Sequence, residues 1–328
     1  MKVLVTGAAG FVGAALAARI AADPQALGPG PVQELALADL GFPGPATSGP
    51  GAARVRQARG DIADPAYLDA LIAEDFDLVF HLASVPGGQA ERDSALGTAA
   101  NLHAATRLLL GLAAQTPQRQ QARRAPPVLV FTSTVAVYGA ALPAQVDEAT
   151  LLRPATSYGA HKLMTEILLS DLSRRGTLDG RAVRLPGIVA RPAQAGGHVS
   201  AFMSNIFHAL AAGQPFDCPV SAEATCWWMS RQRCVDNLLQ LARMSAPPAG
   251  APRVWAMPVL RHSMAELVDA LARRFGDDRR ALVRWRPEPA VEAQFGRQPP
   301  LVSDAARALG LADDGDIDAL VERALAAG

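Results

Sequence analysis

The chain has 328 residues, half of them apolar, and its 31 acidic residues balance its 31 lysines and arginines. This length and composition predict a sizeable buried core, and the balanced charge without long basic runs argues against a nucleic-acid partner. The three cysteines, Cys218, Cys226 and Cys234, form no C-x-x-C pair, so we expect neither a disulfide framework nor a metal site.

The sequence begins MKVLVTGAAG, where the apolar run is too short for a signal peptide and ends at a glycine. No later stretch approaches the ~20 apolar residues that a membrane span requires. We therefore expect a cytoplasmic protein that has no membrane partner.

Two kinds of segment alternate along the first part of the chain. Short strand-like runs have the sequences KVLVTG, ELALADL, ARVRQARGDI, FDLVFHLA, PVLVFTST and RAVRLPGIV. The spacing of apolar residues between them predicts helices over 11–22, 65–73, 95–115 and 157–175. Strands that alternate with helices predict an α/β fold with a doubly wound, mainly parallel sheet. Two segments rich in Pro, Gly, Gln or Arg, 41–52 and 115–127, are expected to be surface loops.

The first strand-like run leads into a glycine-rich turn and a helix. Gly7, Gly10 and Gly13 have the spacing G-x-x-G-x-x-G, and Phe11 and Val12 lie between the last two glycines. Glycines at these positions allow a tight turn, a close approach of backbone N–H groups to a pyrophosphate, and close packing of helix on strand. We expect these five residues to bind a dinucleotide; a purely structural turn is the alternative.

The second run ends in ELALAD, which places Asp39 where a carboxylate accepts hydrogen bonds from the adenosine ribose hydroxyls. A 2′-phosphate there would meet like charge, so Asp39 favours NAD over NADP. The spacing from Gly13 exceeds the usual ~20 residues, and the insertion DPQALGPGPVQ accounts for the excess. The alternative is that Asp39 only begins the next loop.

Ligands of parallel sheets bind beyond the carboxyl ends of the strands, which identifies further residues. By this rule Asp61 and Ile62 border the adenine, and Leu82, Ala83 and Ser84 line the path of the phosphates and the nicotinamide ribose. His81 lies on the strand just before that bend, and we expect it to be structural.

The stretch TSYGAHK places Tyr158 and Lys162 one helical turn apart. An exposed pair of this kind is common on helix surfaces. The functional alternative is a proton-transfer pair, because a phenol has a pKa near ~10 and a lysine cation nearby stabilises the phenolate and lowers that pKa.

Together these motifs resemble the extended short-chain dehydrogenase/reductases, a family that includes nucleotide-sugar epimerases and dehydratases. The segments that carry the resemblance are TGAAGFVG, Asp39, GDI, FHLAS, NLHAATRLLL, FTSTVAVYG, YGAHK and VRLPGIVARP. The resemblance implies a Rossmann-type sheet that binds NAD, and a homodimer formed through the helices at 95–115 and 157–175.

The same resemblance implies roles for individual residues. Tyr158 is the acid/base, Lys162 supports it electrostatically and binds the nicotinamide ribose, and Thr134 is the hydroxyl that binds the substrate oxygen. Ser133 competes with Thr134 for that role, because the family usually has serines here. The remaining cofactor positions are Asn101, Leu185 and Pro186.

The alternation of strands and helices decays after residue 186. We expect a smaller substrate-side domain of 187–234 and 258–328, interleaved with an NAD-binding domain of 1–186 that also receives 235–257. The segment CWWMSRQRCVDNL departs from the Arg-Asp-aromatic pattern of nucleotide-sugar enzymes. Within the family the chain more closely resembles dehydrogenases that use NAD to oxidise the 2-hydroxyl of a four-carbon sugar acid.

Two other functions stay open at this point. One is a nucleotide-sugar epimerase or dehydratase with tightly bound NAD. The other is a non-catalytic binding protein, although such a protein has no need of Thr134, Tyr158 and Lys162.

A small sugar-acid substrate requires a cation for its carboxylate. The candidates are Arg191, Arg231 and Arg233, with Arg231 as first choice and a surface role as the alternative for each. Trp227 and Trp228 either cover the substrate or belong to the core. His198 and Ser200 follow a hinge-like glycine pair and are expected to lie on a mobile flap.

Overall fold

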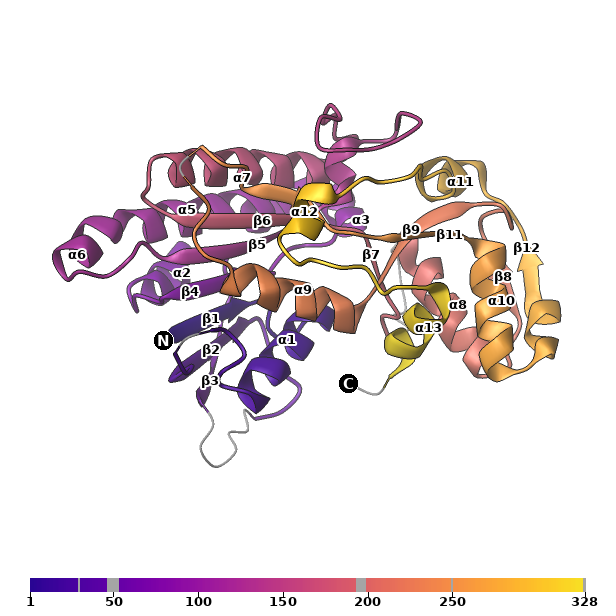
Figure 1. Ribbon diagram of the computed structural model, residues 1–328, viewed down its shortest axis with the longest axis horizontal. Helices are drawn as coiled ribbons and strands as arrows, with labels where there is room; N and C mark the ends of the chain where they lie inside the picture. The colour runs from indigo at the N-terminus through magenta and orange to yellow at the C-terminus, as the bar shows by residue number, and fades with distance from the viewer. Residues whose placement is uncertain (29, 46–52, 193–198, 249, 327–328) are drawn as a thin grey trace.

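A seven-stranded parallel sheet dominates the computed structural model, which describes residues 1–328 except 29, 46–52, 193–198, 249 and 327–328. Its strands lie in the order β10-β6-β5-β4-β1-β2-β3 (Figure 1). They are β1 (Lys2–Thr6), β2 (Glu34–Asp39), β3 (Arg54–Arg59), β4 (Leu78–His81), β5 (Val128–Thr134), β6 (Asp179–Leu185) and β10 (Val254–Ala256). This order confirms the predicted Rossmann-type fold, and the strand order reverses between β1 and β4.

Both faces of the sheet are buried. Because side chains alternate along a strand, Val3 and Val5 of β1 join the core under α1 (Phe11–Ala22) and α9 (Arg231–Arg243). Leu4 joins the opposite core, under α2 (Pro65–Ile72), α5 (Ala104–Ala114) and α7 (Ser157–Arg174). In Figure 1, α5 and α7 run along one side of the sheet and α1 and α9 along the other.

The helices agree with the predicted ranges, with two differences. The predicted helix over 95–115 consists of α4 (Ser94–Thr98), a π-helical turn η1 (Ala99–His103) and α5, and α3 (Gly87–Arg92) precedes it. The segment 115–127 is not wholly a loop, because α6 (Thr116–Gln121) forms within it. Proline at an early position of this helix costs no hydrogen bond, and Arg119 is buried against Asp77, at an Nη2–Oδ1 distance of 2.9 Å.

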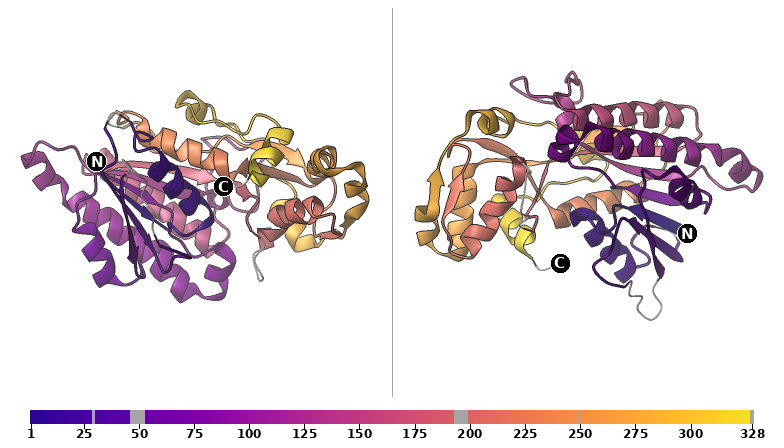
Figure 2. Two further views of the ribbon diagram at one scale, coloured as in Figure 1. Left: turned by 90° about the horizontal axis from the view of Figure 1, so that it is seen from below. Right: turned by 180° about the vertical axis from the view of Figure 1, so that it is seen from behind.

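A second group of elements packs at one end of the sheet (Figures 1 and 2). Its strands are β7 (Gly187–Val189), β9 (Thr225–Ser230) and β11 (Leu260–Ser263) in one small sheet, and β8 (Phe216–Cys218) with β12 (Val283–Trp285) in another. Its helices are α8 (Phe202–Ala211), α10 (Met264–Phe275), α11 (Pro289–Phe295), α12 (Asp304–Ala308) and α13 (Ile317–Leu325), with short 3₁₀ turns η3 (Val199–Ala201) and η4 (Asp277–Leu282). Most of these elements contribute to a separate apolar core.

The chain returns from this second group to the main sheet. α9 packs on α1, and β10 pairs in parallel with β6, with Trp255 opposite Val183. The domain bounds expected above stay a prediction.

Within the described residues, no helix is both long and apolar enough to cross a membrane. The same residues contain no cluster of three or more potential metal ligands.

Candidate active site

The turn after β1 has a geometry that only glycine permits at two positions. Gly7 has a φ of +70°, and a Cβ there would lie 2.7 Å from the backbone nitrogen of Ala83. A Cβ on Gly13 would lie 2.0 Å from the carbonyl oxygen of Gly7. The glycines therefore allow β1, β4 and the start of α1 to approach one another closely.

Two adjoining pockets run along the carboxyl ends of the strands from this turn. The residues that line one or both pockets include Gly7, Gly10, Phe11, Val12, Gly13, Asp39, Asp61, Ile62, Leu82, Ala83, Ser84, Tyr158, Leu185 and Pro186. They are all of the predicted cofactor residues except Asn101 and Lys162. The two pockets share Gly7, Gly10, Leu82 and Ser84, so they form one continuous cleft.

The carboxylate of Asp39 is held at the first end of this cleft. Its Oδ2 accepts from the backbone N–H of Ala9 at 2.9 Å, and its Oδ1 accepts from that of Leu40 at 2.8 Å. Asp39 is thus fixed between β2 and the glycine turn. The arrangement fits an adenosine ribose beside Asp39 and a pyrophosphate over the turn.

Asn101 lies behind the cleft instead of lining it. Its amide accepts from the backbone N–H of Val85 at 2.7 Å and donates to the carbonyl of the same residue at 2.9 Å. Val85 itself lines the cleft. Asn101 therefore fixes the loop that follows β4.

Tyr158 is in the first turn of α7, where Thr156 caps the helix by accepting from the backbone N–H of Gly159 at 3.1 Å. Burial raises the pKa of the Tyr158 phenol, while a hydrogen bond with Ser84 and the charge of Arg191 act in the opposite direction. The sequence predicted a lowered pKa, and this expectation is wrong for the protein without ligands because burial outweighs the nearby charges.

Lys162 is almost completely buried, with 1% of its surface exposed. Its ammonium donates to the carbonyl of Thr132 at 2.9 Å and lies 5.7 Å from the ring centre of Tyr158. Burial lowers the pKa of Lys162 to about 7, although the charge of Glu166 opposes the shift. The pair is therefore not an exposed one.

The hydroxyl groups of Ser133 and Thr134 have different hydrogen-bond partners. The Ser133 hydroxyl donates to the buried carboxylate of Glu166, whereas Thr134 ends β5 with its hydroxyl accepting from Ala136 N at 3.1 Å. Both residues line the cleft, but only Thr134 also lines the cavity next to it. This geometry favours Thr134 as the hydroxyl that faces a substrate.

Glu166 belongs to a buried network that the sequence did not suggest. Its Oε2 accepts from Arg184 Nη2 at 2.8 Å, and Arg184 Nη1 donates to the Tyr138 hydroxyl at 3.2 Å. Glu166 is 2% exposed. The available signal was an acidic residue one helical turn after Lys162. The arginine partner was not apparent because it comes from strand β6.

A second cavity adjoins the cleft beyond Thr134. Residues from widely separated parts of the chain line it: Thr134, Val135, Ala136, Gly139, Ala140, Leu142, Ala155, Thr156, 185–187, Arg191, Ser200, Met203, Trp227, Ala290, Ala293, Gln294, Phe295 and Gln298. Thr134, Leu185, Pro186 and Arg191 also line the cleft, so the two spaces are continuous. Among the described lining residues Arg191 is the single charged one.

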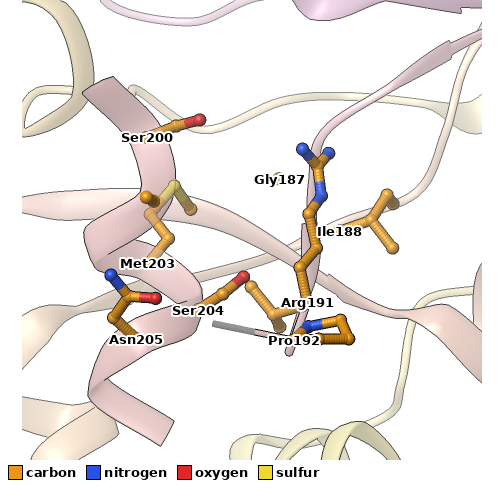
Figure 3. A pocket seen from close by; sticks show the side chains of 10 residues that line it. Gly187, Ile188, Arg191, Pro192, Ser200, Met203, Ser204 and Asn205 are labelled. Carbon is orange, nitrogen blue, oxygen red and sulfur yellow. The ribbon is translucent and has the colours of Figure 1, made fainter. Parts of the chain in front are cut away.

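Arg191 follows β7, and its guanidinium reaches into this region. It also borders a small pocket opposite Ser200 and Met203, where Figure 3 shows its side chain across from the helix that carries those residues. No described carboxylate lies within ion-pair distance of Arg191, and its charge acts on Tyr158. A guanidinium without a described carboxylate partner, in the same cleft as Thr134 and Tyr158, suits an anionic ligand such as a carboxylate.

Arg231, the first choice from the sequence, is located elsewhere. Its guanidinium lies 5.0 Å from the ring centre of Phe11 and lines a groove between α1, α9 and α13, not the cavity. Arg233 does not line the cavity either. We correct the expectation accordingly, because both residues belong to the start of α9, which faces α1.

The remaining sequence candidates divide between core and cavity. His81 is buried, bonds through Nδ1 to the Thr6 hydroxyl at 2.7 Å, and is structural as expected. Trp228 lies in the core, whereas Trp227 is buried and also lines the cavity. Ser200 lines the cavity, and His198 lies outside the described residues.

A family model for the NAD dependent epimerase/dehydratase family matches residues 3–229. The chain belongs to this family. It is 38% identical to the D-erythronate dehydrogenase of Cupriavidus necator, over 98% of this chain and 97% of that protein. The Haemophilus influenzae protein of the same name is 28% identical, with 98% of each chain covered. These relatives confirm the predicted family resemblance and identify the chain as an oxidoreductase.

Solved structures agree with the sequence relatives on the fold. A nucleoside-diphosphate-sugar epimerase from Agrobacterium tumefaciens superposes with a TM-score of 0.88 at 31% identity, covering 98% of this chain and 92% of that one. Its match includes the second group of elements as well as the main sheet. The fold therefore extends over nearly the whole length of both proteins.

Proposed function

We propose that this family member oxidises the 2-hydroxyl of a small sugar acid with NAD, and that D-erythronate is the substrate and 2-oxo-tetronate the product. The observation that carries the proposal is Arg191, the single charged residue among the described ones that line the cavity beside Thr134 and Tyr158. The names of two relatives that match over nearly the whole chain support it.

In this proposal the substrate carboxylate binds Arg191 and its 2-oxygen lies between Thr134 and Tyr158. The C2–H bond breaks with its electron pair, and NAD, when bound, supplies the acceptor of that hydride. The hydroxyl proton passes to the phenolate oxygen of Tyr158 as the C2–O double bond forms. Thr134 donates a hydrogen bond to the same oxygen and does not titrate. The charge of Arg191 favours the phenolate, and Lys162 adds to this effect when it is protonated.

The cleft fits NAD by its shape and its charge. Gly7 and Gly13 bring the backbone of the turn close to β4, and Asp39 lies where a 2′-phosphate would meet a carboxylate. We propose that the enzyme prefers NAD over NADP for this reason.

A nucleotide-sugar epimerase or dehydratase is the second candidate, because it would use the same cleft and the solved structure from Agrobacterium tumefaciens carries an epimerase name. Such a substrate has a diphosphate, for which the described cavity offers one guanidinium. The cavity therefore suits a single carboxylate better.

We further propose a homodimer formed through α5 and α7. Leu110, Met164 and Ile167 are large apolar residues on these helices, and 49%, 44% and 62% of their surfaces are exposed. Light scattering after gel filtration should report a dimer for the native protein and a monomer for Ile167→Glu.

A cytoplasmic location stays a prediction from the sequence.

The decisive experiment measures NADH formation from a panel of four- and five-carbon aldonic acids, with UDP-sugars as the alternative substrates. D-erythronate should give the highest kcat/KM. No turnover of any aldonic acid, together with conversion of a UDP-sugar and NAD retained through purification, would establish the second candidate instead.

A further inference from the structure

Gln298 is held rigidly at the wall of the cavity, just after α11. Its backbone N–H donates to the carbonyl of Thr225 at 3.0 Å. Its carbonyl accepts from the Thr225 hydroxyl at 2.9 Å and from Arg261 Nε at 2.7 Å. Three hydrogen bonds to β9 and β11 thus fix this residue although it lies outside both strands.

The orientation of its side-chain amide is also fixed. The backbone N–H of Trp227 donates to Oε1, so the amide oxygen is used and the amide NH₂ points away from it. Gln298 is among the residues that line the cavity, and within the described residues no acceptor lies in hydrogen-bond geometry with its Nε2. The cavity wall therefore presents a preoriented hydrogen-bond donor at this position.

Arg191 and Gln298 occupy different places relative to Tyr158. Arg191 lines both the cleft that contains Tyr158 and the cavity, whereas Gln298 lines only the cavity. In a 2-hydroxy acid the carboxylate is bonded to the reacting carbon, so it must bind near Tyr158 and Arg191. The rest of the carbon chain then extends into the cavity, toward Gln298.

We propose that Gln298 is a specificity-determining residue that donates a hydrogen bond to a hydroxyl at the far end of the sugar acid. This inference rests on the function proposed above. It explains how the enzyme separates a polyhydroxy acid from a plain 2-hydroxy acid, which fits the cavity but leaves the amide donor unpaired. A site built to bind a hydroxyl rejects the analogue that lacks it more strongly than an apolar wall does.

The test compares D-erythronate with 2-hydroxybutanoate, which has the same carboxylate and 2-hydroxyl but lacks the hydroxyls on C3 and C4. In Gln298→Met, we expect the ratio of kcat/KM for the two acids to fall about ten-fold, chiefly through KM for D-erythronate, since one hydrogen bond is lost. Binding of NAD should stay unchanged. Gln232→Met, an exposed residue on α9, is the matched control and should keep the native ratio.

Gln298→Asn is the second variant, used if the methionine variant has a lowered melting temperature. It keeps the amide, but the shorter side chain cannot reach Trp227 N–H and the substrate together, so the ratio should again fall. An unchanged ratio in the folded variant, with native turnover of D-erythronate, overturns the role of Gln298 and leaves the proposed function intact. If the native protein turns over no sugar acid, the proposed function and this inference both fail.

Discussion

The cofactor cleft and the substrate cavity adjoin one another but are built in different ways. The cleft is formed mostly by short runs of residues at the ends of neighbouring strands, and Gly7 and Gly13 let the turn after β1 pack closely. The cavity is formed by side chains from segments as distant as Thr134 and Gln298. The cleft therefore leaves a short motif in the sequence, whereas the cavity depends on how the chain returns to the site.

This difference predicts how substitutions in the two regions affect binding. The proposed NAD site relies on backbone N–H groups at a helix N-terminus, which do not change when side chains are substituted. In the proposed function the cavity binds the substrate, and its contacts come from single side chains such as Arg191 and Gln298. Mutations on the two sides should therefore affect different kinetic constants.

Tyr158 lies where the cleft meets the cavity, so its removal should have the largest effect. We expect Tyr158→Phe to reduce kcat by about 1,000-fold, within the range for a lost acid/base group, with little change in NAD affinity. Because the pKa of Tyr158 is raised above that of a free phenol, the rate of oxidation by the native enzyme should increase with pH throughout the alkaline range. Stopped-flow NADH absorbance measures both effects. A variant that keeps native kcat would exclude Tyr158 as the base.

Substitution of Arg191 and of Arg231 should have different effects on the KM for the sugar acid. Arg191→Met should raise KM for D-erythronate by about 10- to 100-fold, the loss of one or two charged hydrogen bonds. Arg231→Met, outside the cavity, should change KM less than about two-fold. Steady-state kinetics with saturating NAD decides between them, and the reverse result would restore Arg231 as the carboxylate ligand.

A substitution in the cleft should change the preference between NAD and NADP and leave the KM for the sugar acid unchanged. In Asp39→Ala the carboxylate that opposes a 2′-phosphate is lost, and we expect the preference for NAD over NADP to fall about ten-fold. KM for D-erythronate at saturating cofactor should remain native. Equal ratios of kcat/KM for the two cofactors in variant and native enzyme would remove the role assigned to Asp39.

The smallest effect concerns stability. Burial lowers the pKa of His81 from 6.5 to about 3, so between these values the unfolded chain binds the proton that the folded protein does not. Stability should therefore fall with decreasing pH below about 6.5, by ~1.4 kcal/mol per unit from this group. In His81→Asn this slope should be absent. Urea unfolding at several pH values measures it, and parallel pH dependences would contradict the assignment.

The sequence predicted the main sheet and nearly all of the cleft. Gly7, Asp39 and Ser84 lie at the end of a strand or within three residues after it, and the carboxyl ends of parallel strands meet at one edge. It also identified Tyr158 and Lys162 as a pair, since both lie on one helix.

The residues that line the second cavity were harder to predict from the sequence, because this cavity forms between segments that are distant in the chain. The sequence favoured Arg231 over Arg191, although only the path of β7 brings Arg191 beside Thr134. It did not reveal Gln298, whose amide is oriented by Trp227 far away in the chain. The direction of the Tyr158 pKa shift was wrong because the extent of burial cannot be read from helical spacing.

The position of β10 determines how this enzyme can be engineered. Residues 254–256 complete the edge of the main sheet after the chain has already formed part of the cavity. A shortened chain that ended at β6 would expose the backbone of that strand to association with other chains. Exchange of the substrate side between relatives therefore requires at least three crossover points: one before β7, one before α9 and one after β10.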